Sequence, residues 1–205
     1  MYTPDAKNRI LVAAKKVFAE KTFDGARIND IANLAKVPKS LIYYHFKSKD
    51  DILKTLIKEF LNGYRQLLGI AKEDTHKEKA GRMTGRLQTH YYDFAMQNIE
   101  VVRIMFVESL KKDNGTPPLF MVAEEIIRAE NKADGDVNER QVAEFFSGVI
   151  PLYSYLCFYD QWCGYFHIDR KAFDALFLQH FAQTHGEYHK NKEDGVSCRK
   201  SSELT

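Results

Sequence analysis

The residues best suited to chemistry lie in one short stretch, residues 38–46, which reads Pro-Lys-Ser-Leu-Ile-Tyr-Tyr-His-Phe. Residues four apart share a face of an α-helix, so Lys39 would lie beside Tyr43, and Ser40 beside Tyr44. A cation, a hydroxyl and two phenols on neighbouring faces can bind phosphate oxygens and the edges of bases. The stretch therefore predicts a nucleic-acid contact through at least one tyrosine. The alternative is that both tyrosines pack inside a small helical domain.

Three short helices are expected to position these side chains. Apolar residues at steps of three and four predict helices over residues 6–21 and 28–35, with a loop between them. Pro38 suits the first turn of a third helix, because its missing N–H costs nothing there. Ile42 and Phe46, one turn apart, would then face the two preceding helices. A short helix, a tight turn and a second short helix define a helix-turn-helix, whose second helix enters the major groove of DNA.

A specific pattern of residues runs through this region: Phe23, Gly25, Ile28, Asp30-Ile31-Ala32, Ala35, Val37, Ile42-Tyr43-Tyr44-His45-Phe46-Lys47-Ser48-Lys49 and Leu53. Through this pattern residues 9–53 resemble the N-terminal domain of TetR-family (tetracycline-repressor-like) transcriptional regulators. The resemblance implies a fold of nine helices, with three DNA-binding helices, a linking fourth helix and a ligand-binding body. It also implies dimerisation through the last two helices. The rest of the chain agrees with the family only in length and helix count.

The resemblance also assigns DNA contacts, residue by residue, to Tyr43, Tyr44, His45 and Lys49, and less closely to Lys39. The full set of predicted DNA contacts is Arg27, Lys39, Ser40, Tyr43, Tyr44, His45 and Lys49. For His45 the alternative is a structural histidine near the end of a helix. For Lys39 and Lys49 the alternative is an ordinary solvated lysine.

The chain departs from the family pattern at three positions. Lys36 stands in the turn where the family often has glycine, and a lysine there is strained at positive φ. Leu41 replaces a common threonine of the recognition helix, which removes one hydroxyl contact. Arg27 replaces a common serine or threonine before the second helix, so a capping oxygen is lost but a cation that can reach a phosphate is gained.

The distribution of charge agrees with a polyanionic partner at the N-terminal end. The net charge is +2, yet residues 1–60 hold 12 Lys and Arg against 7 Asp and Glu, whereas the remaining residues hold 18 against 21. A basic N-terminal part on a slightly acidic body favours nucleic acid as the partner, although many solvated helices carry a similar surplus.

Helical spacing continues along the rest of the chain, so the predicted fold class is all-α, with about nine helices. Further helices are expected over residues 49–70, 78–97, 99–112, 119–132, 137–163 and 170–189. Pro151 should kink the helix that contains it. The expected domains are a helix-turn-helix domain over residues 1–48, a helical effector-binding and dimerisation domain over 49–189, and a polar, disordered tail over 190–205.

Two apolar helices near the C-terminal end predict a dimer interface in the form of a four-helix bundle. Its predicted residues are Val142, Phe145, Val149, Leu152, Leu156, Phe173, Leu176, Phe177, His180 and Phe181. A largely apolar effector is predicted to bind among aromatic side chains and one methionine, with phenol hydroxyls orienting it. The candidate residues are Tyr91, Met105, Phe120, Tyr153, Phe158 and Trp162. The alternative is that these side chains fill a core without a pocket.

Other classes of function have less support in the sequence. No stretch approaches the roughly 18 consecutive apolar residues of a membrane span, and the N-terminus lacks the apolar core of a signal peptide, so we expect a cytoplasmic protein without membrane contact. Three cysteines, Cys157, Cys163 and Cys198, are typical of free thiols. His185 and His189 have a spacing that can bind a metal, but no Cys or carboxylate pattern lies near them in the sequence, so no metal site and no cofactor are predicted.

No catalytic constellation is visible, which argues against an enzyme. The patterns together predict a homodimeric repressor that binds a palindromic operator in double-stranded DNA and is released from it by a small-molecule effector. The alternative is a small-molecule-binding helical protein, or an interaction module, without DNA function.

Overall fold

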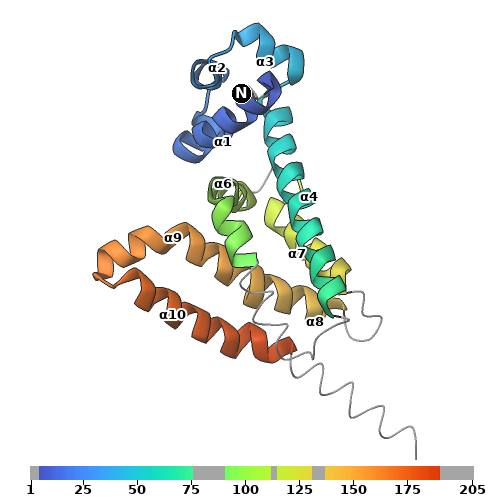
Figure 1. The fold of residues 1–205 in the computed structure, drawn as a ribbon, viewed down its shortest axis with the longest axis vertical. Coiled ribbons are helices and arrows are strands. Elements are labelled where there is room, and N and C mark those ends of the chain that lie inside the picture. The colour runs from blue at the N-terminus through green and yellow to red at the C-terminus, as the bar shows by residue number, and fades with distance from the viewer. Residues whose placement is uncertain (1–4, 76–90, 112–114, 131–136, 190–205) are drawn as a thin grey trace, which may run out of the picture.

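The computed structural model of the chain describes residues 5–75, 91–111, 115–130 and 137–189, and over these ranges it is built of helices without a strand (Figure 1). The α-helices are α1 (Ala6–Gly25), α2 (Ile28–Ala35), α3 (Lys39–His45), α4 (Lys49–Thr75), α6 (Ile99–Ser109), α7 (Pro118–Glu130), α8 (Val137–Val142), α9 (Ile150–Phe166) and α10 (Arg170–Phe181). Residues 91–97 and 187–189 are helical as well, and two segments, η1 (Ala143–Val149) and η2 (Ala182–Gly186), are π-helical. The all-α fold class is therefore confirmed. The predicted tail, and most of the helix expected over residues 78–97, lie outside the described residues.

The N-terminal domain consists of α1, α2 and α3, which pack on one another through apolar side chains. Ile10, Phe18, Ile31 and Ile42 are almost completely buried there, and Phe46 joins them just after α3. Burying a side chain of this size contributes about 1.5–3 kcal/mol. Because Ile42 and Phe46 face this core, as the sequence predicts, the orientation of α3 about its own axis is fixed.

Two residues other than glycine adopt positive φ in this domain. Lys36, at the end of α2, has φ 54° and ψ 50°, so the turn of the helix-turn-helix forms with lysine in the left-handed position. Thr22 has φ 60° and interrupts α1, which then continues to Gly25 where the sequence predicts a loop. Such a backbone costs of order 1–3 kcal/mol at a residue other than glycine. The interrupted turn places the carbonyl groups of Phe23 and Ala26 within hydrogen-bond distance of a side chain from α4.

The long helix α4 connects the N-terminal domain to the body. In Figure 1 it leaves the N-terminal domain and runs beside α7. Arg65 of α4 forms a two-point ion pair with Glu125 of α7, with Nε 2.8 Å from Oε2 and Nη2 2.9 Å from Oε1. α4 carries apolar side chains into the core of both parts, so one helix joins them.

The segments α8, η1 and α9 form one continuous helical run that contains Pro151. In a regular α-helix the proline ring would clash with the carbonyl of Ser147, four residues earlier. The wider π-helical turn ends just before the proline, where the N–H of Ile150 donates to the carbonyl of Phe145. The position at which the sequence predicts a kink therefore carries a π-helical segment.

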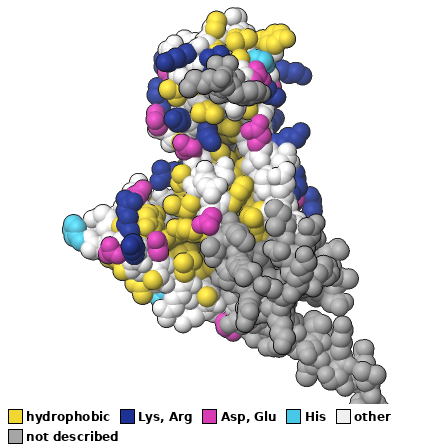
Figure 2. All heavy atoms as spheres, in the orientation of Figure 1, with side chains coloured by type: hydrophobic (Ala, Val, Ile, Leu, Met, Phe, Trp, Pro, Cys, Tyr) yellow, Lys and Arg dark blue, Asp and Glu magenta, His cyan; other side chains and the backbone are white. Residues whose placement is uncertain are grey.

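This continuous run, Val137–Phe166, is long and apolar enough to cross a membrane by length and composition alone, with a mean hydropathy of 1.2. Core helices of proteins that never enter a membrane meet the same criterion. Here one side of the run packs on the body, while Phe146 and Phe158 on the other side are 65% and 52% exposed. Hydrophobic side chains gather at the surface over α9 and α10 (Figure 2).

Candidate nucleic-acid interface

The exposed side of α3 carries the side chains that the sequence singles out. Tyr44 is 81% exposed and Tyr43 is 51% exposed, and Lys39 and Ser40 are exposed at the start of the helix. Ile42, on the opposite side of α3, is 1% exposed. Because the buried side of α3 is fixed in the core, the two phenols, the hydroxyl and the ammonium group are brought together at the surface. This surface can offer donors and acceptors to a polyanion with exposed base edges.

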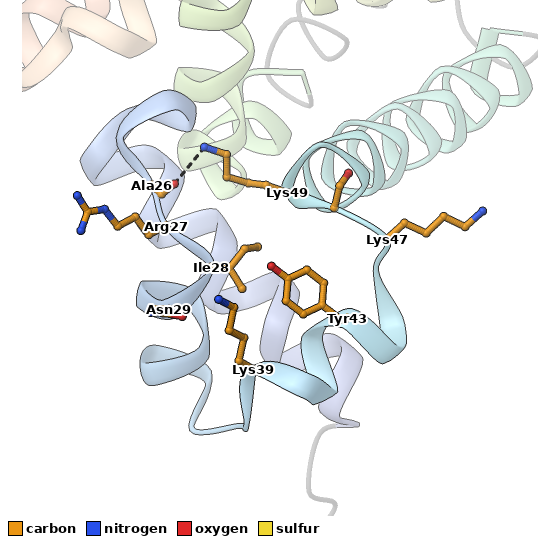
Figure 3. Close-up of a pocket in the computed structure, with 9 residues that line it drawn as sticks. Ala26, Arg27, Ile28, Asn29, Lys39, Tyr43, Lys47 and Lys49 are labelled. Atoms are coloured by element: carbon orange, nitrogen blue, oxygen red, sulfur yellow. Dashed lines mark hydrogen bonds between the residues drawn. The ribbon is translucent and has the colours of Figure 1, made fainter.

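A groove of about 610 Å³ opens beside this surface, between the start of α2, α3 and the turn before α4 (Figure 3). It is lined by Ala26, Arg27, Ile28, Asn29, Lys39, Tyr43, Lys47, Ser48 and Lys49. Lys39 and Tyr43 point into the groove from α3, and the ammonium of Lys39 lies 5.9 Å from the centroid of the Tyr43 ring. Together with Arg27 and Lys47, Lys39 gives the groove a positive potential that attracts phosphate groups.

Lys49 has a different role from the predicted one. Its ammonium nitrogen donates to the carbonyl oxygens of Phe23 at 2.6 Å, Ala26 at 3.0 Å and Asp24 at 3.4 Å, and lies 4.4 Å from the centroid of the Phe23 ring. An ammonium group has three protons, and these three carbonyls use all of them. The prediction that Lys49 contacts DNA is therefore corrected: the side chain fastens the start of α4 to the C-terminal end of α1.

Two other cations stand at the edge of the groove. Arg27 precedes α2, and its backbone N–H donates to the Asp30 carboxylate at 3.1 Å, so Asp30 satisfies this N–H while the guanidinium is exposed. The backbone N–H of Lys47 donates to Asp51 at 2.9 Å, and its side chain is exposed. Lys47 was not among the predicted contacts, although it belongs to the sequence pattern, because it lies outside α3 and the resemblance assigned no contact to it.

His45 is half-buried at the end of α3. Its ring centroid lies 5.0 Å from that of Tyr44 and 6.4 Å from that of Phe46. The ring therefore joins the exposed phenol to the buried core. Leu41 packs partly against the same core, so the hydrophobic residue that replaces the family's threonine contributes to stability.

A three-helix domain with a tight turn, an exposed α3 and a basic groove, carried at one end of a helical body, defines a helix-turn-helix protein of the DNA-binding type. Residues 10–56 match the sequence model of the bacterial regulatory proteins of the tetR family. Over residues 10–56 the chain therefore has the N-terminal DNA-binding domain of the tetR family, as the sequence pattern predicts.

Two similar proteins of known sequence match about half of this chain and about half of their own length. The HTH-type transcriptional repressor NicS of Pseudomonas putida is 31% identical over 105 residues, which cover 51% of this chain and 48% of NicS. The probable HTH-type transcriptional regulator YttP of Bacillus subtilis is 26% identical over 102 residues, 50% of this chain and 49% of YttP. The chain thus spans about half the length of these relatives.

Two solved structures resemble the chain over both of its parts. The fatty acid degradation regulator FadR from Bacillus halodurans has a TM-score of 0.57 at 16% identity, covering 85% of this chain and 96% of its own. FadR from Bacillus subtilis, solved in complex with stearoyl-CoA, has a TM-score of 0.56 at 20% identity with the same coverage. At these identities the comparison establishes a shared fold.

The predicted effector residues do not converge on one place in the body. Met105 and Tyr153 are buried, Tyr91 is half-buried, and Phe120, Phe158 and Trp162 are 47%, 52% and 45% exposed. The assignment of the last three residues to an enclosed pocket is corrected, because rings that are exposed to this extent cannot enclose a ligand within one subunit. A cavity of about 120 Å³ lies elsewhere, between α1, α4, residues 94–98 and α6.

A group of phenols inside the body is a better candidate for an effector site. Tyr64 of α4 is buried, and its ring centroid lies 5.4 Å from that of Tyr91. Burial, and next the nearby Tyr153 phenol, raise the pKa of Tyr64. The Tyr153 hydroxyl is buried and has no hydrogen-bond partner among the described residues. Tyr64 was missed because it continues the apolar stripe of α4, although a phenol in such a stripe was a signal.

The predicted dimer residues divide into three sets. Val142, Leu176 and His180 are exposed, whereas Phe145, Leu152, Phe173 and Phe177 are half-buried. Val149, Leu156 and Phe181 are 2%, 1% and 8% exposed, which corrects their assignment to the interface, because they face the core of their own subunit. The exposed apolar surface of α9 and α10 instead includes Phe158, Trp162, Phe166 and Leu178, and Phe146 of η1 is exposed as well.

Proposed function

We propose that the chain is a ligand-responsive transcriptional repressor that binds a palindromic operator in double-stranded DNA as a homodimer. The observation that carries this proposal is the exposed surface of α3, where Tyr43, Tyr44 and Lys39 stand beside the basic groove within the segment that matches the tetR family. Repression is supported by the likeness to NicS, a transcriptional repressor. We propose that the chain has no catalytic role. We also propose that it is located in the cytoplasm, where such a regulator meets its DNA.

Direct readout would come from α3, and phosphate contacts from the cations around it. Tyr43, Tyr44, Ser40 and His45 are the candidates for contacts to base edges or nearby phosphates. The ammonium and guanidinium groups of Lys39, Arg27 and Lys47 are the candidates for phosphates, since they are exposed around the groove.

The homodimer would form through the exposed apolar surface of α9 and α10. A contiguous apolar patch on a water-soluble protein marks an interaction site. Leu176 of α10, with Phe158 and Trp162 of α9, supplies large side chains of this patch, and Val142 at the end of α8 is exposed as well. A dimer that spans a palindrome must hold its two α3 helices about 34–36 Å apart, one turn of the DNA duplex. Residues 1–48 would then form the DNA-binding domain and residues 49–189 the effector-binding and dimerisation domain.

The effector would bind near the three phenols Tyr64, Tyr91 and Tyr153 and act through α4. Tyr64 lies on α4, and Lys49 at the other end of the same helix holds the end of α1. A ligand that displaces Tyr64 would therefore move the N-terminal domain of one subunit relative to its partner. A 100-fold loss of operator affinity requires the effector to favour the non-binding arrangement by only about 2.7 kcal/mol. The mainly aromatic surroundings support a largely apolar effector.

The proposal is tested by binding of the full chain to fragments of the source genome at several salt concentrations. We expect selection of specific fragments, and loss of that selection in the double variant Lys39→Ala, Tyr43→Ala. Lys58→Ala, an exposed lysine of α4 outside the groove, serves as the control and should bind like the wild type. A wild-type chain that retains no fragment, or a double variant that selects the same fragments, would contradict the DNA-binding function and favour a ligand-binding module instead.

A further inference from the structure

A compact group of side chains that can ligate a metal lies where η2 and residues 187–189 pack against η1, away from α3. Glu144 comes from η1, His185 from η2, and His189 from the helical residues that follow. Nε2 of His185 lies 3.6 Å from Oε2 of Glu144, Nε2 of His189 lies 3.4 Å from Oε1 of Glu144, and the two Nε2 atoms are 3.2 Å apart. Two imidazoles and a carboxylate are a known set of three protein ligands for Zn²⁺.

The distances among the three residues agree with the edges of a coordination tetrahedron. Zn²⁺ lies about 2.0–2.1 Å from an imidazole nitrogen and about 2.0–2.2 Å from a carboxylate oxygen, so its tetrahedral ligand atoms are about 3.3–3.6 Å apart. The observed separations run from 3.2 to 3.6 Å, with His185 facing Oε2 and His189 facing Oε1 of the carboxylate. The three ligand atoms lie within 4.8 Å of one another, so an ion could enter between the residues after a rotation of the Glu144 carboxylate.

The hydrogen bonds of Ser147 determine which ring nitrogen of His185 carries the proton. The Ser147 hydroxyl donates to the carbonyl of Ala143 at 2.6 Å, which uses its only proton. Its oxygen also lies 3.0 Å from Nδ1 of His185, so at that contact the oxygen accepts and Nδ1 carries the proton. Nε2 of His185 then presents its lone pair to Glu144 and His189. A histidine that ligates a metal through one nitrogen and donates from the other has this arrangement.

The local backbone is shaped around the His185 ring. Glu144, Ser147 and Gly148 stand on one π-helical segment and His185 on the other, and π-helical turns occur frequently at functional sites. A Cβ atom added to Gly148 would lie 2.7 Å from Cε1 of His185, so the absence of a side chain at residue 148 makes room for the imidazole.

The group is also shielded from solvent. The side chain of Glu144 is 1% exposed, that of His185 is 12% exposed and that of His189 is 25% exposed. A carboxylate that is buried to this extent is stabilised by a cation at contact distance.

We propose that Glu144, His185 and His189 bind one divalent transition-metal ion of the Zn²⁺ type, with a fourth coordination position open to water or another ligand. The imidazoles favour Zn²⁺, Co²⁺ or Ni²⁺ over Mg²⁺ and Ca²⁺, which take oxygen ligands. The ion would fasten η2 and residues 187–189 to η1. This inference does not depend on the proposed DNA-binding function, because it concerns metal binding and stability alone.

The test is a titration of the full chain, freed of metal with a chelator, first with Co²⁺ and then with Zn²⁺. We expect one Co²⁺ per chain, with the strong visible absorption of four- or five-coordinate Co²⁺, and its displacement by Zn²⁺ but not by Mg²⁺. The unfolding temperature should rise with the Zn²⁺ concentration. A chain that takes up no stoichiometric Co²⁺ or Zn²⁺ would overturn the proposal and leave the group as a hydrogen-bonded polar cluster.

The variant His189→Gln tests whether the three residues bind the metal. His189 is the most exposed of the three side chains, so its replacement disturbs the core least. We expect it to lose the Co²⁺ absorption while its far-ultraviolet circular dichroism remains that of the metal-free wild type. Ser147→Ala should weaken Zn²⁺ binding by about 10–100-fold, since it removes the acceptor of the Nδ1 proton. His180→Gln, an exposed histidine of the same helical run, is the control and should bind like the wild type. Wild-type binding in His189→Gln would refute the assignment.

Discussion

Lys111 and Asp24 join the body to the N-terminal domain: the ammonium of Lys111, just after α6, lies 2.7 Å from Oδ2 of Asp24 in the last turn of α1. The same ammonium lies 2.7 Å from Oε1 of Glu108, whose side chain is 4% exposed, and 5.6 Å from the centroid of the Phe23 ring. Its hydrogen bond lowers the pKa of the Asp24 carboxyl. A movement of α6 would therefore displace the end of α1. This contact is a second connection between the body and the N-terminal domain, in addition to α4.

The two ends of this contact should differ in their effect on stability. Lys111→Gln should lower the free energy of unfolding by about 1–3 kcal/mol, because the buried Glu108 loses a charged donor. Asp24→Asn should change it little, because the Asp24 side chain is 71% exposed and ion pairs in solvent contribute little. Urea unfolding of the two variants measures the difference, and equal losses would show that the contact to Asp24 matters as much as that to Glu108.

Tyr44 should contribute to operator binding and not to folding. Tyr44→Ala is expected to weaken binding to a selected operator by about 1–3 kcal/mol, the range of a good contact to a base, while the unfolding temperature stays unchanged because the ring is 81% exposed. Tyr44→Phe separates the hydroxyl from the ring. If Tyr44→Ala binds the operator as tightly as the wild type, Tyr44 lies outside the interface.

Lys39 and Lys49 should respond differently to salt. Lys39→Ala is expected to reduce the slope of log affinity against log salt by about one, as for a lost phosphate contact. Lys49→Met should leave that slope unchanged and should instead lower the stability of the chain, because three carbonyl groups at the end of α1 lose their donor. Binding at four salt concentrations and thermal unfolding distinguish the two roles. A flatter slope in Lys49→Met would restore Lys49 to the set of phosphate contacts.

The dimer surface can be tested with a matched pair of leucines. Leu176 of α10 is 50% exposed and Leu34 of α2 is 49% exposed. A charge at Leu176 would be buried in the proposed interface at high cost, whereas a charge at Leu34 would stay in solvent. Leu176→Glu should therefore sediment as a monomer and Leu34→Glu as a dimer. Dimers in both variants would place the interface away from this part of α10.

The ion pair between Arg65 and Glu125 should give stability a measurable pH dependence. The hydrogen bond from Arg65 lowers the pKa of Glu125 below its unfolded value of 4.5. The unfolded chain therefore takes up the proton first as the pH falls, so the stabilisation is complete above pH 4.5 and is lost as the pH falls through the folded pKa. The difference in free energy of unfolding between wild type and Glu125→Gln should be constant from about pH 8 to 5.5 and shrink below pH 4.5. A difference independent of pH down to about pH 3 would exclude this contribution.

Much of the N-terminal domain follows from its sequence alone. The spacing of Ile42 and Phe46 fixes which side of α3 is buried, and therefore which side exposes Tyr43 and Tyr44. The sequence pattern of residues 9–53 was specific enough to identify the family, which the match over residues 10–56 confirms. Helical periodicity suffices here because a three-helix domain is small, and each helix has one buried side.

In the body, periodicity predicted the helices but not their neighbours. Val149, Leu156 and Phe181 were expected at the dimer interface, and the structure buries them within the subunit. A helix that is apolar on more than one side gives no indication of which side meets its own subunit and which stays exposed. Only the packing of the helix against the body determines which side is buried within the subunit.

The sequence thus determined the all-helical fold, the family of the N-terminal domain and the exposed face of α3. The tertiary structure decided the role of Lys49, whose acceptors come from residues 23–26, and the grouping of Glu144 with His185 and His189. In both cases the partners lie more than 20 residues apart in the chain. Local spacing reports which side chains share one face of one helix, whereas contacts between helices depend on how those helices pack, and packing is a property of the whole core.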